Sequence, residues 1–128
     1  MYVAFVLSGP LFDADACTAF VGLQPTKVSQ PRPSALQNVT GVAAQSWVIS
    51  RQGFKNITLG DAFGELLSVV WPKRARIKSF AKRSNLSISF DAFVYIRKTA
   101  IPVLTIDARI LKRMAWFEAA MGIDTALV

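Results

Sequence analysis

The densest group of chemically capable side chains is a basic segment covering residues 73–83. Such a run can bind phosphates or the carboxylates of a partner protein, but it can also be the solvated face of an ordinary helix. Both interpretations stay open, because the whole chain carries a net charge of +7 and no acidic residue interrupts the segment. Its cations are Lys73, Arg74, Arg76, Lys78, Lys82 and Arg83.

Residues suited to covalent, acid–base or metal chemistry are scarce. The chain has no histidine and one cysteine, and it contains no glycine-rich phosphate-binding motif. Asp13 and Asp15 form a candidate carboxylate pair for acid–base or metal chemistry, but Asp is favoured at helix starts, so we interpret them as helix caps. Cys17 lies on the apolar side of a predicted helix, which indicates a buried, inert thiol. We therefore predict a protein that is not an enzyme and holds no cofactor and no metal.

Composition predicts one domain, residues 1–128, with a substantial core, since 52% of the residues are hydrophobic. No apolar run approaches the roughly 20 residues of a membrane-spanning helix. A single cysteine excludes an internal disulfide, which agrees with a reducing compartment. We expect a cytoplasmic protein, and the positive charge favours a negatively charged partner.

The element that must organise the fold is a strand over residues 86–96. Every second residue from Leu86 to Ile96 is apolar, so one face of this strand is fully hydrophobic and needs helices packed on it. The other face ends in Phe93 and Tyr95. These two aromatic side chains could stack nucleic-acid bases, but aromatic strand residues more often belong to a core, and we predict the latter.

The other elements follow from capping residues and periodicity. A first helix begins at Asp13 or Asp15 and ends at Gly22, and a second begins at Thr58 and ends at Pro72. A short basic helix over 73–83 precedes the central strand. The last helix begins at Asp107 and is expected to run to Gly122, with Met121 on its apolar face. Further strands are predicted at residues 2–7, 23–28, 47–49 and 123–128.

This order predicts a single α+β domain. We expect an antiparallel or mixed sheet of about five strands with helices packed on one face, as a ferredoxin-like pseudo-repeat of two βαβ-like halves over residues 2–28 and 86–128. Residues 29–45 show no periodicity and read as a long loop. That loop is a second candidate contact surface, which would contribute Arg32 together with the nearby Lys27.

Several short motifs carry a family resemblance. They are Ser8-Gly9, Phe12-Asp13, the segment Gly22-Leu23-Gln24-Pro25-Thr26, the strand Trp47-Val48-Ile49-Ser50, the leucine-rich helix ending at Pro72, and Gly122-Ile123-Asp124. On these the chain resembles a small, mostly bacterial family catalogued as domain of unknown function 4279. The resemblance implies a compact α+β domain with no catalytic residues to carry over. By analogy, similar small domains beside bacterial toxin genes act as immunity proteins.

We therefore expect a non-enzymatic protein-binding module, an immunity protein that binds and blocks a bacterial toxin. Its partner would present an acidic surface, and the oligomeric state stays open. The alternative is a basic nucleic-acid-binding regulatory domain that uses the same cations. The residues predicted to contact the partner are Lys73, Arg74, Arg76, Lys78, Lys82, Arg83, Lys27 and Arg32.

Overall fold

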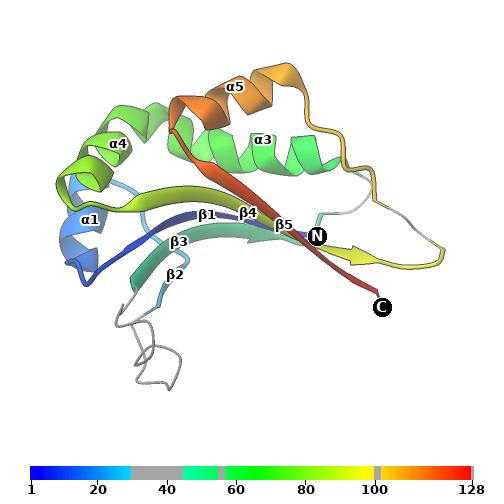
Figure 1. Cartoon of the computed structure of the whole chain (residues 1–128), viewed down its shortest axis with the longest axis horizontal. Helices are drawn as coiled ribbons and strands as arrows, with labels where there is room; N and C mark the ends of the chain where they lie inside the picture. Colours follow the sequence, from blue (N-terminus) through cyan, green and yellow to red (C-terminus); the bar gives the residue numbers. More distant parts are fainter. Residues whose placement is uncertain (30–44, 55–56, 100–101, 128) are drawn as a thin grey trace.

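A computed structural model describes residues 1–29, 45–54, 57–99 and 102–127 of the chain. Its centre is a five-stranded mixed sheet in the order β2-β3-β1-β4-β5 (Figure 1). Strand β1 runs antiparallel to β3 and β4, β2 runs antiparallel to β3, and β5 runs parallel to β4. This confirms the predicted α+β domain with a mixed sheet. The strands are β1 (Tyr2–Gly9), β2 (Lys27–Ser29), β3 (Gln45–Gln52), β4 (Ser87–Ile96) and β5 (Ala120–Leu127).

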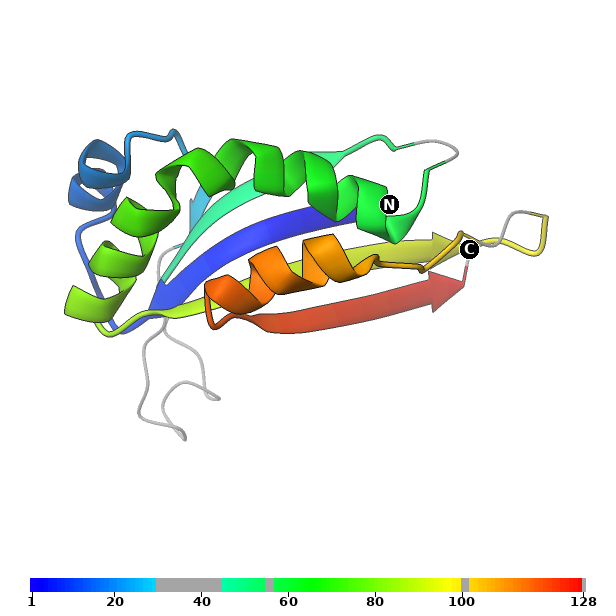
Figure 2. The same cartoon turned by 90° about the horizontal axis from the view of Figure 1, so that it is seen from above.

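The helices lie on one face of the sheet (Figures 1 and 2). They are α1 (Ala14–Val21), α3 (Leu59–Val70), α4 (Arg74–Arg83) and α5 (Ala108–Trp116), and the 3-10 turn η1 (Trp71–Lys73) joins α3 to α4. The predicted caps are confirmed. The side chains of Asp13, Thr58 and Asp107 each accept a hydrogen bond from a backbone N–H three residues further on, which satisfies a free donor of the first turn.

The core fills the space between these helices and the sheet. Alternate residues of the two central strands point into it, among them Phe5 of β1 and Phe90 of β4, which are fully buried. Their rings pack edge to face at 5.2 Å, and Phe63 of α3 meets Phe90 at 6.3 Å. Burying each large side chain contributes about 1.5–3 kcal/mol, so this layer supplies much of the fold's stability.

The opposite face of the sheet has no helix on it among the described residues. Phe93 and Tyr95 point to this face and pack on each other at 5.1 Å. Tyr95 is 48% exposed, so the prediction that it is a core residue was wrong. The period-two pattern placed both aromatics on one face correctly, but strand periodicity does not tell which faces of a sheet are covered.

The last helix is shorter than predicted. It ends at Trp116, and a turn brings the chain back into β5 at Ala120, so Met121 and Gly122 belong to a strand. Glu118 adopts a positive φ of 55°, and its N–H donates to the Ala115 carbonyl, which closes the turn. Gly122 lies beside β4, where a Cβ would come within 2.9 Å of the Asp91 carboxylate. It therefore leaves room for the Asp91 side chain and does not end a helix.

Two further predictions concern boundaries. Ser29 is the last residue of β2 and Gln45 the first of β3, and residues 30–44 of the predicted loop lie outside the described residues.

The two predicted βαβ-like halves place their strands differently in the sheet. β4 and β5 are neighbours, whereas β3 lies between β1 and β2, so the pseudo-repeat is not confirmed. In the described ranges, no helix is long and apolar enough to cross a membrane.

Candidate functional site

The basic segment folds as α4, whose buried stripe fixes where its cations point. Ile77, Phe80 and Ala81 face the core, so the charged residues are directed outward on both flanks of the helix. Helical spacing sorts them into two rows. We call all six together the basic helix surface. The row towards α5 holds Arg74, Lys78 and Lys82, and the row towards α1 holds Lys73, Arg76 and Arg83.

The row towards α5 is fixed by two tryptophans. The Arg74 guanidinium lies 4.3 Å above the Trp71 ring, and its Nη1 donates to the Trp71 carbonyl at 2.9 Å. Arg113 of α5 lies 4.8 Å from the same ring, which also packs edge to face on Trp116 at 5.8 Å. Such cation–π contacts contribute about 0.5–1 kcal/mol each at exposed positions. Both guanidinium groups are therefore held in place and keep further N–H donors for a ligand.

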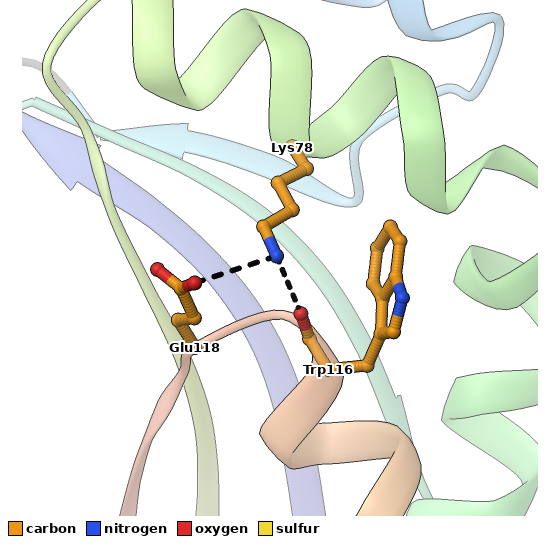
Figure 3. Close-up of polar contacts among 3 residues, drawn as sticks. All are labelled: Lys78, Trp116 and Glu118. Atoms are coloured by element: carbon orange, nitrogen blue, oxygen red, sulfur yellow. Dashed lines mark hydrogen bonds and ion pairs between the residues drawn. The ribbon is translucent and has the colours of Figure 1, made fainter.

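Lys78 connects α4 to the end of α5 (Figure 3). Its Nζ donates to the Trp116 carbonyl at 2.8 Å, lies 3.6 Å from a carboxylate oxygen of Glu118, and lies 4.6 Å from the Trp116 ring centre. The Trp116 carbonyl belongs to the last turn of α5, where helix carbonyls lack partners inside the helix. A cation is favoured there by the helix dipole. Lys78 therefore has a structural role besides its charge.

The row towards α1 is fixed in part. Arg76 donates from Nη1 to the Phe20 carbonyl at 3.1 Å, and the Arg83 guanidinium lies 4.5 Å above the Phe20 ring. The side-chain ammonium groups of Lys73 and Lys82 make no hydrogen bond and no ion pair with any described residue. Four of the six cations are thus held by neighbouring elements, and the two lysines project from the same surface.

A groove lies beside the row towards α5. It has a volume of about 480 Å³ and is lined by the polar side chains of Lys78, Lys82, Asn85 and Glu118. Apolar residues of β4 and of the turn after α5 also line it, among them Ile88 and Phe117. The groove joins α4 to the first residue of β5, Ala120.

The structure brings six of the eight predicted contact residues together and separates the others. Lys27 of β2 pairs with Val48 of β3, and Val48 pairs with Val6 of β1. Paired residues share a face of the sheet, and Val6 alternates with the core residue Phe5, so Lys27 lies on the face opposite the helices. Lys27 therefore lies apart from the basic helix surface, and its role in partner contact stays a prediction. Arg32 lies outside the described residues.

Sequence reasoning missed three members of this surface. Trp71, Trp116 and Arg113 were not assigned to it, yet they support Arg74 and Lys78. Trp71 directly precedes the basic segment, so its position was a usable signal. Arg113 and Trp116 come from a helix over thirty residues away, and nothing in their local sequence shows that α5 lies against α4.

Candidate groups for covalent or metal chemistry lie apart from this surface. Cys17 is buried, as predicted, and burial raises the pKa of its thiol from 9.0 to about 12. No three His, Cys, Asp or Glu residues within the described part of the chain are grouped to hold a metal ion. The chemistry that the basic helix surface offers is the binding of anionic groups by fixed guanidinium and ammonium donors.

These features define a small α+β domain with one layer of helices on a mixed sheet and a basic surface on its α4 helix. The family described as Domain of unknown function (DUF4279) matches residues 1–127, and the chain belongs to this family. No curated protein and no solved structure gives a significant match.

Proposed function

We propose that this protein is a non-enzymatic binding module of the bacterial cytosol that docks on an acidic surface of a partner protein through the basic helix surface. The observation that carries the proposal is the clustering of six cations on one exposed helix. In the described part of the chain, only Glu118 forms an ion pair with any of them. Charges of this kind steer association and select an oppositely charged partner.

The aromatic support strengthens the proposal. Binding hot spots are enriched in Trp and Arg, and Trp116, which is 38% exposed, lies beside Arg74 and Lys78. Because Arg74 and Arg113 already rest on Trp71, little side-chain freedom is lost when a partner binds them. The surface therefore combines a fixed centre with two further lysines, Lys73 and Lys82, whose ammonium groups have no ion-pair partner among the described residues.

We place the protein among immunity proteins on the analogy that such small domains neutralise bacterial toxins. Blockade would be steric and electrostatic: the rigid helix layer covers an acidic region of the toxin and keeps its substrate out. Fold alone does not give function, so this assignment depends on the identity of the partner.

Nucleic-acid binding is the alternative that the same cations support. Single-stranded binders combine a basic groove with stacking aromatics on one surface. Phe93 and Tyr95 lie on the sheet face away from α4, so these two aromatics cannot stack bases beside the basic helix surface. An exposed ring, Trp116, does lie next to its cations, and we keep the nucleic-acid function second because one such ring offers little stacking.

The test is capture of a partner from bacterial lysate with three forms of the chain. Lys73→Glu/Lys82→Glu replaces the two lysines whose side chains make no hydrogen bond and no ion pair with a described residue. The control variant Lys27→Glu/Arg51→Glu lowers the net charge of the chain by the same amount, from +7 to +3, at positions away from α4 (two cations lost and two anions gained). We expect the first variant alone to lose a protein partner, and co-expression of the wild-type chain to protect cells from that partner.

Two results would count against the proposal. Equal loss of the partner in both variants would show a dependence on net charge only. Recovery of DNA or RNA in place of protein, with affinity that falls steeply as salt is added, would establish the alternative function.

A further inference from the structure

Strand β5 forms an open edge of the sheet. It pairs with β4 on one side along all of Ala120–Leu127, and no described element lies on its other side (Figure 2). Alternate residues of such an edge direct unpaired N–H and C=O groups outward, which is a template for another strand. The opposite edge strand, β2, has only three residues. The sheet therefore has one long edge with free backbone groups.

This edge lacks the features by which proteins usually block strand pairing. It contains no proline and no lysine, and its only charged residue is Asp124. Met121 and Ile123 point to the helix side, next to Phe90 and Ala92 of β4, yet they are 45% and 41% exposed. An edge with exposed apolar side chains and no charge barrier is suited to the addition of a further strand.

Helix α5 forms a wall beside β5. Its Met114 is buried, and Arg113 stacks on Trp71, so that flank faces the core and η1. Leu111 and Ala115 lie on the other flank of the helix at 100° per residue, and Leu111 is 43% exposed. An added strand would place its apolar side chains on the helix side next to Met121 and Ile123, the exposed apolar residues of β5.

Charge at the two ends of the edge identifies the occupant. The groove at Ala120, where β5 begins, is lined by Lys78, Lys82 and Glu118, so two cations and one carboxylate lie at this end. Arg97 and Lys98 directly follow β4, next to the end of β5, because Ile96 pairs with Leu127. In an antiparallel pair of two copies, the lysines of one chain would meet Arg97 and Lys98 of the other, and like charges oppose that contact. An extended segment with acidic ends fits the edge.

We propose that β5 receives an extended segment of the partner, apolar along its centre and acidic at its ends, as a sixth strand of the sheet. This inference rests on the proposed function and names how the partner is held. The groove between α4 and Ala120 makes the edge continuous with the basic helix surface. Backbone pairing would contribute affinity, and the cations at the ends would select the acidic segment.

The experiment is a titration of the isotope-labelled chain, followed by amide chemical shifts, with the peptide Glu-Glu-(Val-Thr)₃-Glu-Glu. One matched peptide carries Lys in place of Glu, and another is N-methylated at alternate residues. The variant Ile123→Lys places a charge on the edge. Leu11→Lys makes the same change at a residue outside the sheet that is 69% exposed. With the wild-type chain and the acidic peptide, we expect amide shifts along residues 120–127. Affinity should fall by at least about tenfold for each matched peptide, and by the same factor for the acidic peptide with Ile123→Lys, but not with Leu11→Lys.

Three outcomes would overturn strand addition. The first is equal binding of the N-methylated peptide with shifts confined to α4. The second is no binding of any peptide at low salt. The third is a concentration-dependent dimer, seen by light scattering, that Ile123→Lys abolishes, which would make a second copy the occupant. None of these decides the proposed function, which the Lys73→Glu/Lys82→Glu variant tests separately with the captured partner.

Discussion

Replacing Lys78 by methionine tests whether the basic helix surface is held rigidly by α5. Methionine keeps most of the length of the side chain and loses its charge. The wild-type Nζ makes three contacts, with the Trp116 carbonyl, the Trp116 ring and the Glu118 carboxylate (Figure 3). If these contacts fix α5 to α4, their loss lowers the free energy of unfolding.

The expected loss follows from the three contacts. The hydrogen bond to the Trp116 carbonyl at 2.8 Å involves a charged donor but is open to solvent, so we assign it about 0.5–1.5 kcal/mol. The cation–π contact adds about 0.5 kcal/mol. The ion pair adds little, because the Glu118 side chain is 81% exposed. Together they predict that Lys78→Met destabilises the fold by about 1–2 kcal/mol.

The assay is urea unfolding, with Lys82→Met as the matched control. Lys82 lies one turn further along the same row, and its side chain makes no hydrogen bond or ion pair with a described residue, so its replacement should change stability by less than about 0.5 kcal/mol. A double-mutant cycle with Trp116→Leu should show a coupling of about 0.5–1 kcal/mol. Equal effects of the two lysine substitutions, with no coupling, would refute the view that α5 holds this row in place.

Three further predictions concern the scaffold. Gly60→Ala should destabilise the fold by about 1–3 kcal/mol in urea unfolding, because the new Cβ would lie 2.8 Å from the Thr105 carbonyl oxygen. Gly64→Ala has room for a Cβ, so it should be neutral or stabilising by up to about 1 kcal/mol in the same assay. Asp107→Ala should cost about 0.5–2 kcal/mol by removing the cap of α5, measured by the same method. Cys17 should react with a thiol reagent at pH 8 only as fast as the protein unfolds. Its folded-state pKa of about 12 lies above the ordinary 9.0, so its contribution to stability is complete below pH 9 and is lost as the pH rises toward 12.

Local patterns predicted most of the fold. The alternation in β4 identified the face of the sheet that carries the helices, and Asp13, Thr58 and Asp107 marked three helix starts. The end of α5 was missed because helical spacing continues through Phe117 and Met121. The turn depends on a positive φ at Glu118, a residue type that gives no sign of it. There the packing of Phe117 into the core determined the boundary.

The candidate site was predictable only where it is contiguous in sequence. The run over residues 73–83 identified the six cations of the basic helix surface, five on α4 and Lys73 at its start. Their aromatic supports on α5 depend on how helices pack, and the face of Lys27 depends on how β2 pairs with β3. The local sequence contains neither kind of information, so the composition of the surface had to come from the structure.

We propose that the basic helix surface, rather than the net charge, recognises the partner. The most direct test is the association rate constant of the captured partner with the wild-type chain, Lys73→Glu/Lys82→Glu and Lys27→Glu/Arg51→Glu, measured by surface plasmon resonance at low and high salt. We expect about a tenfold slower association for Lys73→Glu/Lys82→Glu alone at low salt, with the difference shrinking as salt screens the charges. Equal rates for both variants, or an unchanged rate for Lys73→Glu/Lys82→Glu, would contradict it.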